Sequence, residues 1–133
     1  MKNINIYYSL VFGIMVFVSS CKKEEDDHHD ASATIEIAAP LATNMYNQGD
    51  TVFINATITA EAAMHGWELH LRKKADQTEV FSADAHDHAA TYNISEYWVN
   101  NVTADTQMEL EIIATIDHDG NTANKKVEFH CHQ

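Results

Sequence analysis

The sequence is poor in the residues that build several common functional sites. Its 133 residues include only four glycines, one proline and two cysteines. None of the glycines has the spacing of a phosphate-binding loop or a nucleophile elbow, so neither nucleotide binding nor serine-type hydrolysis is indicated. Basic residues are also scarce, because eight lysines and arginines stand against 20 acidic residues, for a formal net charge of −12. A chain this acidic is not expected to bind nucleic acid or an anionic membrane surface through its charge.

The longest apolar run, at the start of the chain, is too short to cross a bilayer comfortably. Lys2 precedes a run from Ile6 to Val18, and about 13 residues is the length of a signal-peptide apolar region. The following Ser19-Ser20-Cys21 resembles the lipobox of bacterial lipoproteins, in which the cysteine is lipid-modified and begins the mature chain. This resemblance implies a signal peptide over residues 1–20 and a membrane anchor at Cys21. The alternative is a transmembrane anchor followed by an acidic loop.

The residues after Cys21 are charged and lack apolar periodicity. The stretch CKKEEDD resembles the export signal of Bacteroidota lipoproteins, which implies the outer face of the outer membrane as the location. We interpret residues 21–33 as a lipidated cysteine followed by a disordered acidic tether. A lipidated Cys21 cannot pair with Cys131, so the fold has to be held by its core without a disulfide.

From residue 34 onward, apolar residues recur at every second position, which is typical of half-buried strands. About seven short strands are expected, and no segment predicts a helix. They cover residues 34–39, 50–60, 66–74, 78–83, 91–99, 107–117 and 122–132. This pattern predicts an all-β fold, an immunoglobulin-like antiparallel β-sandwich over residues 34–133. Trp67, on the third expected strand, fits the buried tryptophan of such domains.

The last strand ends in the unusual sequence VEFHCHQ. Cys131 has the same parity as Val127 and Phe129, so a regular strand directs it into the core. His130 and His132 have the opposite parity and are expected to point to solvent. Three consecutive ligands for one metal ion are therefore not expected from this stretch.

Histidine is the most unusual part of the composition, with nine residues. His86 and His88 form a short H-x-H pair in an expected loop and are the foremost metal-ligand candidates, and His65 lies in another loop. On the outward face of one sheet, His70 and His130 are expected beside acidic residues, with His130 close to Glu109. The candidate ligands are His65, His70, His86, His88, His130 and His132. Imidazole and carboxylate together suit zinc, and copper or nickel less specifically. The alternative is a set of scattered, solvated histidines on an acidic surface.

The stretch DHDGN, residues 117–121, has some features of a calcium loop. Asp117, Asp119, Asn121 and Glu128 stand at positions 1, 3, 5 and 12, but Thr122 occupies the position that requires glycine. Asp-Gly is also a favoured pair in hairpin turns. We therefore predict a turn here.

The segments SSCKKEEDD, GDTVFINATI, GWELHL, HDHAATYNI and ATIDHDGNTANKKVEF together resemble small Bacteroidota surface lipoproteins with a single immunoglobulin-like domain of unknown function. The resemblance implies a location and a fold but no reaction. We expect a non-enzymatic, lipid-anchored module that binds a partner, in its most specific version Zn or Cu captured through histidines. The alternative is an accessory subunit of an uptake or adhesion complex, which would present an exposed apolar or aromatic patch to a protein partner. Tyr92, Tyr97 and Trp98 are the candidates for this patch, and a place in the core is the equal alternative for them.

Overall fold

The computed structural model describes residues 32–133. The expected signal peptide, Cys21 and nearly all of the expected tether lie outside the described residues, so the lipid anchor stays a prediction. Among residues 32–133 there is no helix that is long and apolar enough to cross a membrane. The first strand begins at Ala33, one residue before the expected start of the domain.

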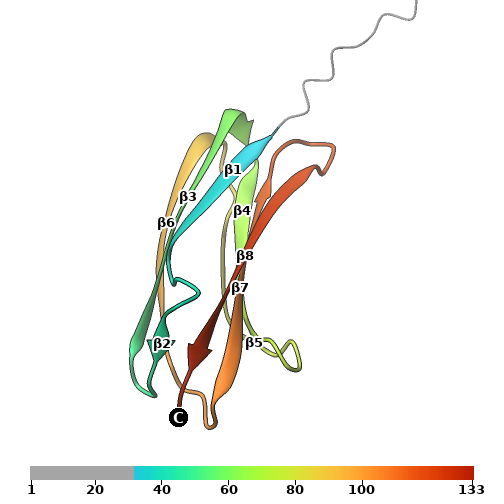
Figure 1. Ribbon diagram of the computed structural model, residues 1–133. Coiled ribbons are helices and arrows are strands. Elements are labelled where there is room, and N and C mark those ends of the chain that lie inside the picture. Colours follow the sequence, from blue (N-terminus) through green and yellow to red (C-terminus); the bar gives the residue numbers. More distant parts are fainter. Residues whose placement is uncertain (1–31) are drawn as a thin grey trace, which may run out of the picture.

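Two β-sheets pack face to face, as Figure 1 shows. One sheet has three strands in the order β1-β3-β6, and the other has five strands in the order β2-β8-β7-β4-β5. The strands are β1 Ala33–Ala39, β2 Met45–Tyr46, β3 Thr51–Met64, β4 Gly66–Lys73, β5 Glu79–Ala85, β6 Ala89–Val99, β7 Thr106–Thr115 and β8 Thr122–Cys131. The expected immunoglobulin-like sandwich is confirmed. The two-residue β2, which pairs in parallel with β8, was not expected because two residues show no periodicity.

The core lies between the sheets and is built from the inward residues of each alternating strand. Ile54 and Ile58 of β3 face Leu69 of β4 and Leu110 of β7 across it, and all four are fully buried. Each such side chain contributes roughly 1.5–3 kcal/mol through removal from water. Trp67 is also buried, at 9% exposure, as its position on the third expected strand indicated.

The phase of β8 is also confirmed. Phe129 and Cys131 are buried at 1% and 0% exposure, whereas His130 and His132 lie half-exposed on the other side of the strand. Burial raises the pKa of the Cys131 thiol to about 11, so this cysteine is a protonated core residue at neutral pH.

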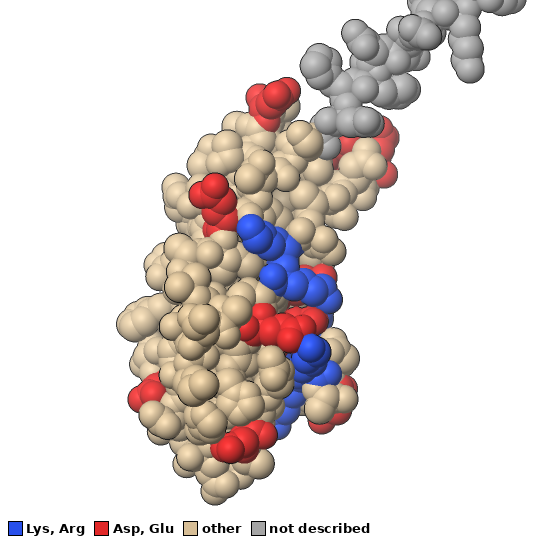
Figure 2. Space-filling view, in the orientation of Figure 1, with Lys and Arg blue, Asp and Glu red and all other residues tan. Residues whose placement is uncertain are grey.

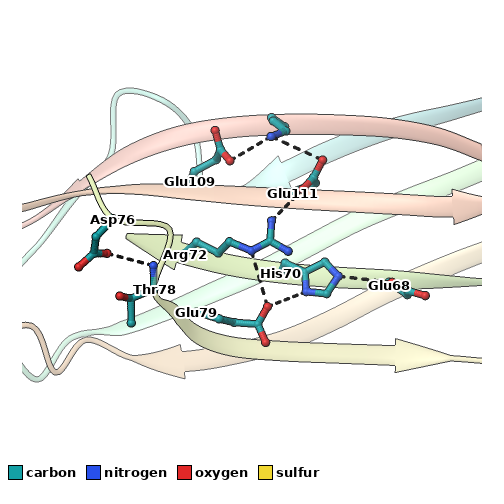
Figure 3. A network of polar contacts seen from close by, with 9 residues as sticks. Glu68, His70, Arg72, Asp76, Thr78, Glu79, Glu109 and Glu111 are labelled. Atoms are coloured by element: carbon teal, nitrogen blue, oxygen red, sulfur yellow. Dashed lines mark hydrogen bonds and ion pairs between the residues drawn. The ribbon is translucent and has the colours of Figure 1, made fainter. Parts of the chain in front are cut away.

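The outer face of the five-stranded sheet carries a network of ion pairs. Basic side chains form one band in Figure 2, with acidic side chains among them. Arg72 binds Glu111 at 2.9 Å, and Lys126 binds Glu109 at 3.0 Å and Glu111 at 3.6 Å. Figure 3 shows Arg72 of β4 beside Glu109 and Glu111 of β7. The charges on this face are therefore largely engaged with one another.

Candidate metal centres at the two ends of the sandwich

Four histidines from three separate connections gather at one end of the sandwich. His65 lies between β3 and β4, His86 and His88 between β5 and β6, and His118 between β7 and β8. The ring centre of His65 is 3.8 Å from that of His118 and 4.5 Å from that of His88. The ring of His86 lies 6.4 Å from that of His88. We call these four residues the histidine cluster; the connections that carry them meet at the upper end of Figure 1.

A buried tyrosine fixes the connection that carries His86 and His88. The Tyr92 hydroxyl donates to the carbonyl oxygen of Asp87 at 2.6 Å and to that of Met64 at 3.4 Å. It also accepts a hydrogen bond from the backbone N–H of Ala89 at 3.2 Å. One side chain thus bonds to the residue between His86 and His88 and to the residue before His65.

The other two segments of the histidine cluster are also held by hydrogen bonds. The backbone N–H of His65 donates to the Thr115 carbonyl at 2.8 Å. The Asp117 carboxylate accepts from the backbone N–H groups of Asp119 and Asn121 and from the Asn121 side-chain amide. These bonds close the DHDGN turn, as predicted. Glu128, which stands at position 12 of the calcium-loop pattern, forms an ion pair with Lys74 at 2.6 Å. The backbone around the cluster is therefore built in advance of any ligand.

The close approach of β4 and β5 beside the cluster depends on a glycine. Gly66 has a φ of +130°, and a Cβ there would collide with the carbonyl oxygen of Ala85. A hollow of about 60 Å³ lies here, and His65, His86, Glu68 and Asp84 are among its lining residues. The two acidic residues make the surroundings of this hollow more favourable for a cation than for an anion.

The surroundings of His65 favour its neutral imidazole. Desolvation lowers the pKa of His65, and the nearby His118 and His88 lower it further, whereas Asp117 opposes this shift. A neutral imidazole is the form that binds a metal ion. Proton loss from His65 is thus favoured by the same neighbours that would share the ion.

The ring positions come close to those that a metal ion requires. A zinc ion bound through one nitrogen lies about 3.2 Å from the ring centre, so two ligating rings at a tetrahedral angle have centres about 5 Å apart. The rings of His65, His88 and His118 have centres 3.8, 4.5 and 6.3 Å apart. Shifts of roughly 1.5 Å or less would bring the ring centres to this spacing, and side-chain rotation would also have to direct one nitrogen of each ring toward the ion.

A second group lies at the opposite end of the sandwich, near the C-terminus. Among residues 32–133, Asp105, His130 and His132 are the one set of three potential ligands whose ligand atoms all lie within 4.8 Å of one another. The Nδ1 atom of His132 is 3.2 Å from Oδ1 of Asp105, and the two imidazole rings have centres 4.7 Å apart. The histidine cluster does not meet this distance condition with its rings as they lie.

His70 belongs to neither group. Its Nδ1 lies 2.7 Å from Glu79 and its Nε2 lies 3.4 Å from Glu68 (Figure 3). The expectation that His130 lies beside Glu109 is wrong, because β7 and β8 pair two residues away from the expected alignment. His130 pairs with Gln107, while Glu109 binds Lys126.

Two residues that complete these groups were missed from the sequence. His118 was assigned only to a turn, and Asp105 lies in the β6–β7 connection without any motif. The signal for His118 was available, because alternate loops of a sandwich meet at the same end and the turn sequence contains a histidine. No sequence signal points to Asp105, because its position depends on the register of β7 with β8.

Comparison with known proteins shows similarity of fold only. No protein-family model and no curated protein matches the chain. Among solved structures, the fibronectin(III)-like modules of Clostridium thermocellum CbhA are 16% identical, with a TM-score of 0.48, and the match covers 74% of this chain and 96% of that one. Murine CRIg is 12% identical, with a TM-score of 0.43, over 76% of this chain and 97% of that one. The strand order itself places the described chain in the class of immunoglobulin-like β-sandwich modules.

Proposed function

We propose that this protein is a non-enzymatic, lipid-anchored module of the outer-membrane surface that captures a transition metal ion, zinc or copper, at the histidine cluster. The observation that supports this function is the convergence of His65, His88 and His118 from three connections, with His86 as an additional ligand. Three imidazoles suit zinc and copper, and an acidic surface raises the local concentration of cations. The anchor rests on the lipobox resemblance at Cys21.

The test is a calorimetric titration with Zn²⁺ and Cu²⁺ of the full chain in detergent, with His28 and His29 replaced by alanine. We call this the background chain, and the two substitutions remove histidines that belong to neither group. We expect stoichiometric binding with a dissociation constant below about 1 µM. The affinity should weaken as the pH is lowered and the imidazoles become protonated.

A triple variant in the background chain, H65A/H88A/H118A, then locates the site. It is expected to lose one bound ion per chain, whereas His70→Ala, a histidine held in the ion-pair network, leaves the stoichiometry unchanged. Equal stoichiometry in the triple variant and the background chain would refute capture at the histidine cluster.

A different observation favours the second candidate function, an accessory interaction subunit. Of the three candidate aromatics, Tyr92 and Trp98 are core residues, which is the alternative that the sequence left open. Tyr97 is 63% exposed and lies opposite Phe53, which is 58% exposed. Val99 is also exposed. The outward side chains of β3 between residues 51 and 59 and of β6 between 91 and 99 carry no charge. This uncharged area of β3 and β6 has two exposed aromatic rings and is bordered by the exposed Glu36 of β1, opposite Thr57. Such an area suits an apolar partner surface.

This alternative is tested by photo-crosslinking in intact cells. A photoreactive residue at position 97 should crosslink to one protein of defined mass, and the same residue at position 125 on the opposite sheet should not. Equal labelling from both positions would contradict the alternative.

A further inference from the structure

The Asp105–His130–His132 group differs from the histidine cluster in its chemistry and its position. It lies at the end of the sandwich that carries the C-terminus (Figure 1) and includes a carboxylate. We propose that these three residues form a second, independent metal site that takes Zn²⁺, with a fourth position open to water or to a ligand from solution. This site goes beyond the capture function proposed for the histidine cluster and does not depend on it.

The alternation of β8 explains why the two imidazoles meet. Cys131 points into the core at 0% exposure, so its neighbours His130 and His132 project together from the other side. The backbone at this point is fixed by β2, since the N–H of His132 donates to the Tyr46 carbonyl at 2.8 Å and that of His130 donates to the Asn44 carbonyl at 3.3 Å. The strand therefore holds both rings at a set spacing.

A buried asparagine fixes the chain end against the β6–β7 connection. Asn100 is 1% exposed, and its amide donates to the carbonyl oxygens of His132 at 3.2 Å and Tyr46 at 3.1 Å. Its side-chain oxygen accepts from the N–H of Val102, at the start of the connection that carries Asp105. Asp105 in turn accepts a hydrogen bond from the N–H of Gln133 at 3.3 Å. The carboxylate and the two imidazoles thus come from segments that are tied to each other on both sides.

One of the ligand-atom distances already matches a tetrahedral zinc ion, and the whole set is compact. Neighbouring ligand atoms around such an ion are about 3.3 Å apart. His132 Nδ1 and Asp105 Oδ1 are 3.2 Å apart, and the whole set lies within 4.8 Å. Binding here needs smaller side-chain movements than binding in the histidine cluster. Two neutral imidazoles and one carboxylate are a usual set for zinc with an open position, and the 66% exposure of the Asp105 side chain leaves that position accessible.

The experiment separates this site from the histidine cluster. Zn²⁺ is titrated into the background chain that also carries H65A/H88A/H118A, and one ion per chain is expected to remain bound. Adding His132→Ala should weaken this remaining binding at least about 100-fold, and Asp105→Asn, which keeps an oxygen that can accept from Gln133, should weaken it about tenfold or more. The control His70→Ala should leave it unchanged.

Titration with Co²⁺ provides a second measurement. The triple variant should develop the strong visible absorption of tetrahedral cobalt, and His132→Ala should abolish it. The proposal is overturned if the triple variant binds no zinc, or if His132→Ala and Asp105→Asn, both folded by circular dichroism, bind it as tightly as their parent. Failure of the histidine cluster alone would appear differently, as zinc binding that is lost with His132→Ala in the background chain and unaffected by H65A/H88A/H118A.

Discussion

Replacing Tyr92 by phenylalanine tests whether the histidine cluster is organised in advance. Tyr92 is 6% exposed. Its hydroxyl donates a hydrogen bond to the Asp87 carbonyl and accepts one from the Ala89 N–H, and these two residues flank His88. Removal of the hydroxyl leaves both backbone groups without this partner, and a net hydrogen bond contributes about 1 kcal/mol. We therefore expect a loss of roughly 2 kcal/mol in the free energy of unfolding, or a fall in melting temperature of roughly 8 °C for a domain of this size.

The same substitution should weaken metal binding without removing a ligand. Groups that orient metal ligands typically change affinity by about 10–100-fold, and we expect a loss near the lower value for zinc at the histidine cluster. Unfolding by heat in zinc-free buffer measures the first effect, and calorimetric titration of the background chain with His132→Ala measures the second. Tyr97→Phe is the matched control, because this tyrosine is 63% exposed.

Two results would refute this reasoning. An unchanged melting temperature would mean that the hydroxyl does not hold the connection between β5 and β6. The expected fall in melting temperature together with an unchanged zinc affinity would mean that the loop geometry fixed by Tyr92 does not matter for binding. The imidazoles would then bind the ion without being held in place beforehand.

Three further predictions concern the fold. Cys131 should resist alkylation at pH 8, because burial raises its pKa to about 11, and should be labelled only after denaturation; mass spectrometry of its peptide measures this, and rapid native labelling would contradict its core position. Gly66→Ala should cost about 2 kcal/mol or more, because of the positive φ and the collision with Ala85; denaturant unfolding that matches the wild type would refute this. Hydrogen bonds from Thr78, first from its backbone N–H and then from its side chain, lower the pKa of Asp76 in the folded protein. The charged Asp76 carboxylate should therefore stabilise the fold fully above its unfolded pKa of about 3.9. This stabilisation should disappear as the pH falls through the lower folded pKa. Asp76→Asn should reduce the dependence of the free energy of unfolding on pH in that acidic range, as measured by denaturant unfolding at a series of pH values. An unchanged pH dependence would show that the Asp76 charge is not involved.

The sequence by itself determined most of the strands and their inward faces. Alternation with a period of two places Ile54, Leu69 and Leu110 in the core because successive side chains of a strand point to opposite sides. The same rule correctly assigned Cys131 to the core and its two histidine neighbours to the surface. It could not find β2, because two residues carry no period, and it underestimated β3, whose last residues before Met64 do not alternate.

Only the tertiary structure decided which ligands meet. His65, His88 and His118 are distant in sequence and come together because the strand order brings three connections to one end of the sandwich. His130 approaches Asp105 instead of Glu109 because the pairing of β7 with β8 places it opposite Gln107. His70 carries the same side chain as the others, but its neighbours on the sheet are Glu68 and Glu79, so its ring nitrogens are engaged in hydrogen bonds. The alternation of a strand can be read from the residues of that segment alone. A binding site depends on strand register and strand order, which are fixed only when both sheets have formed.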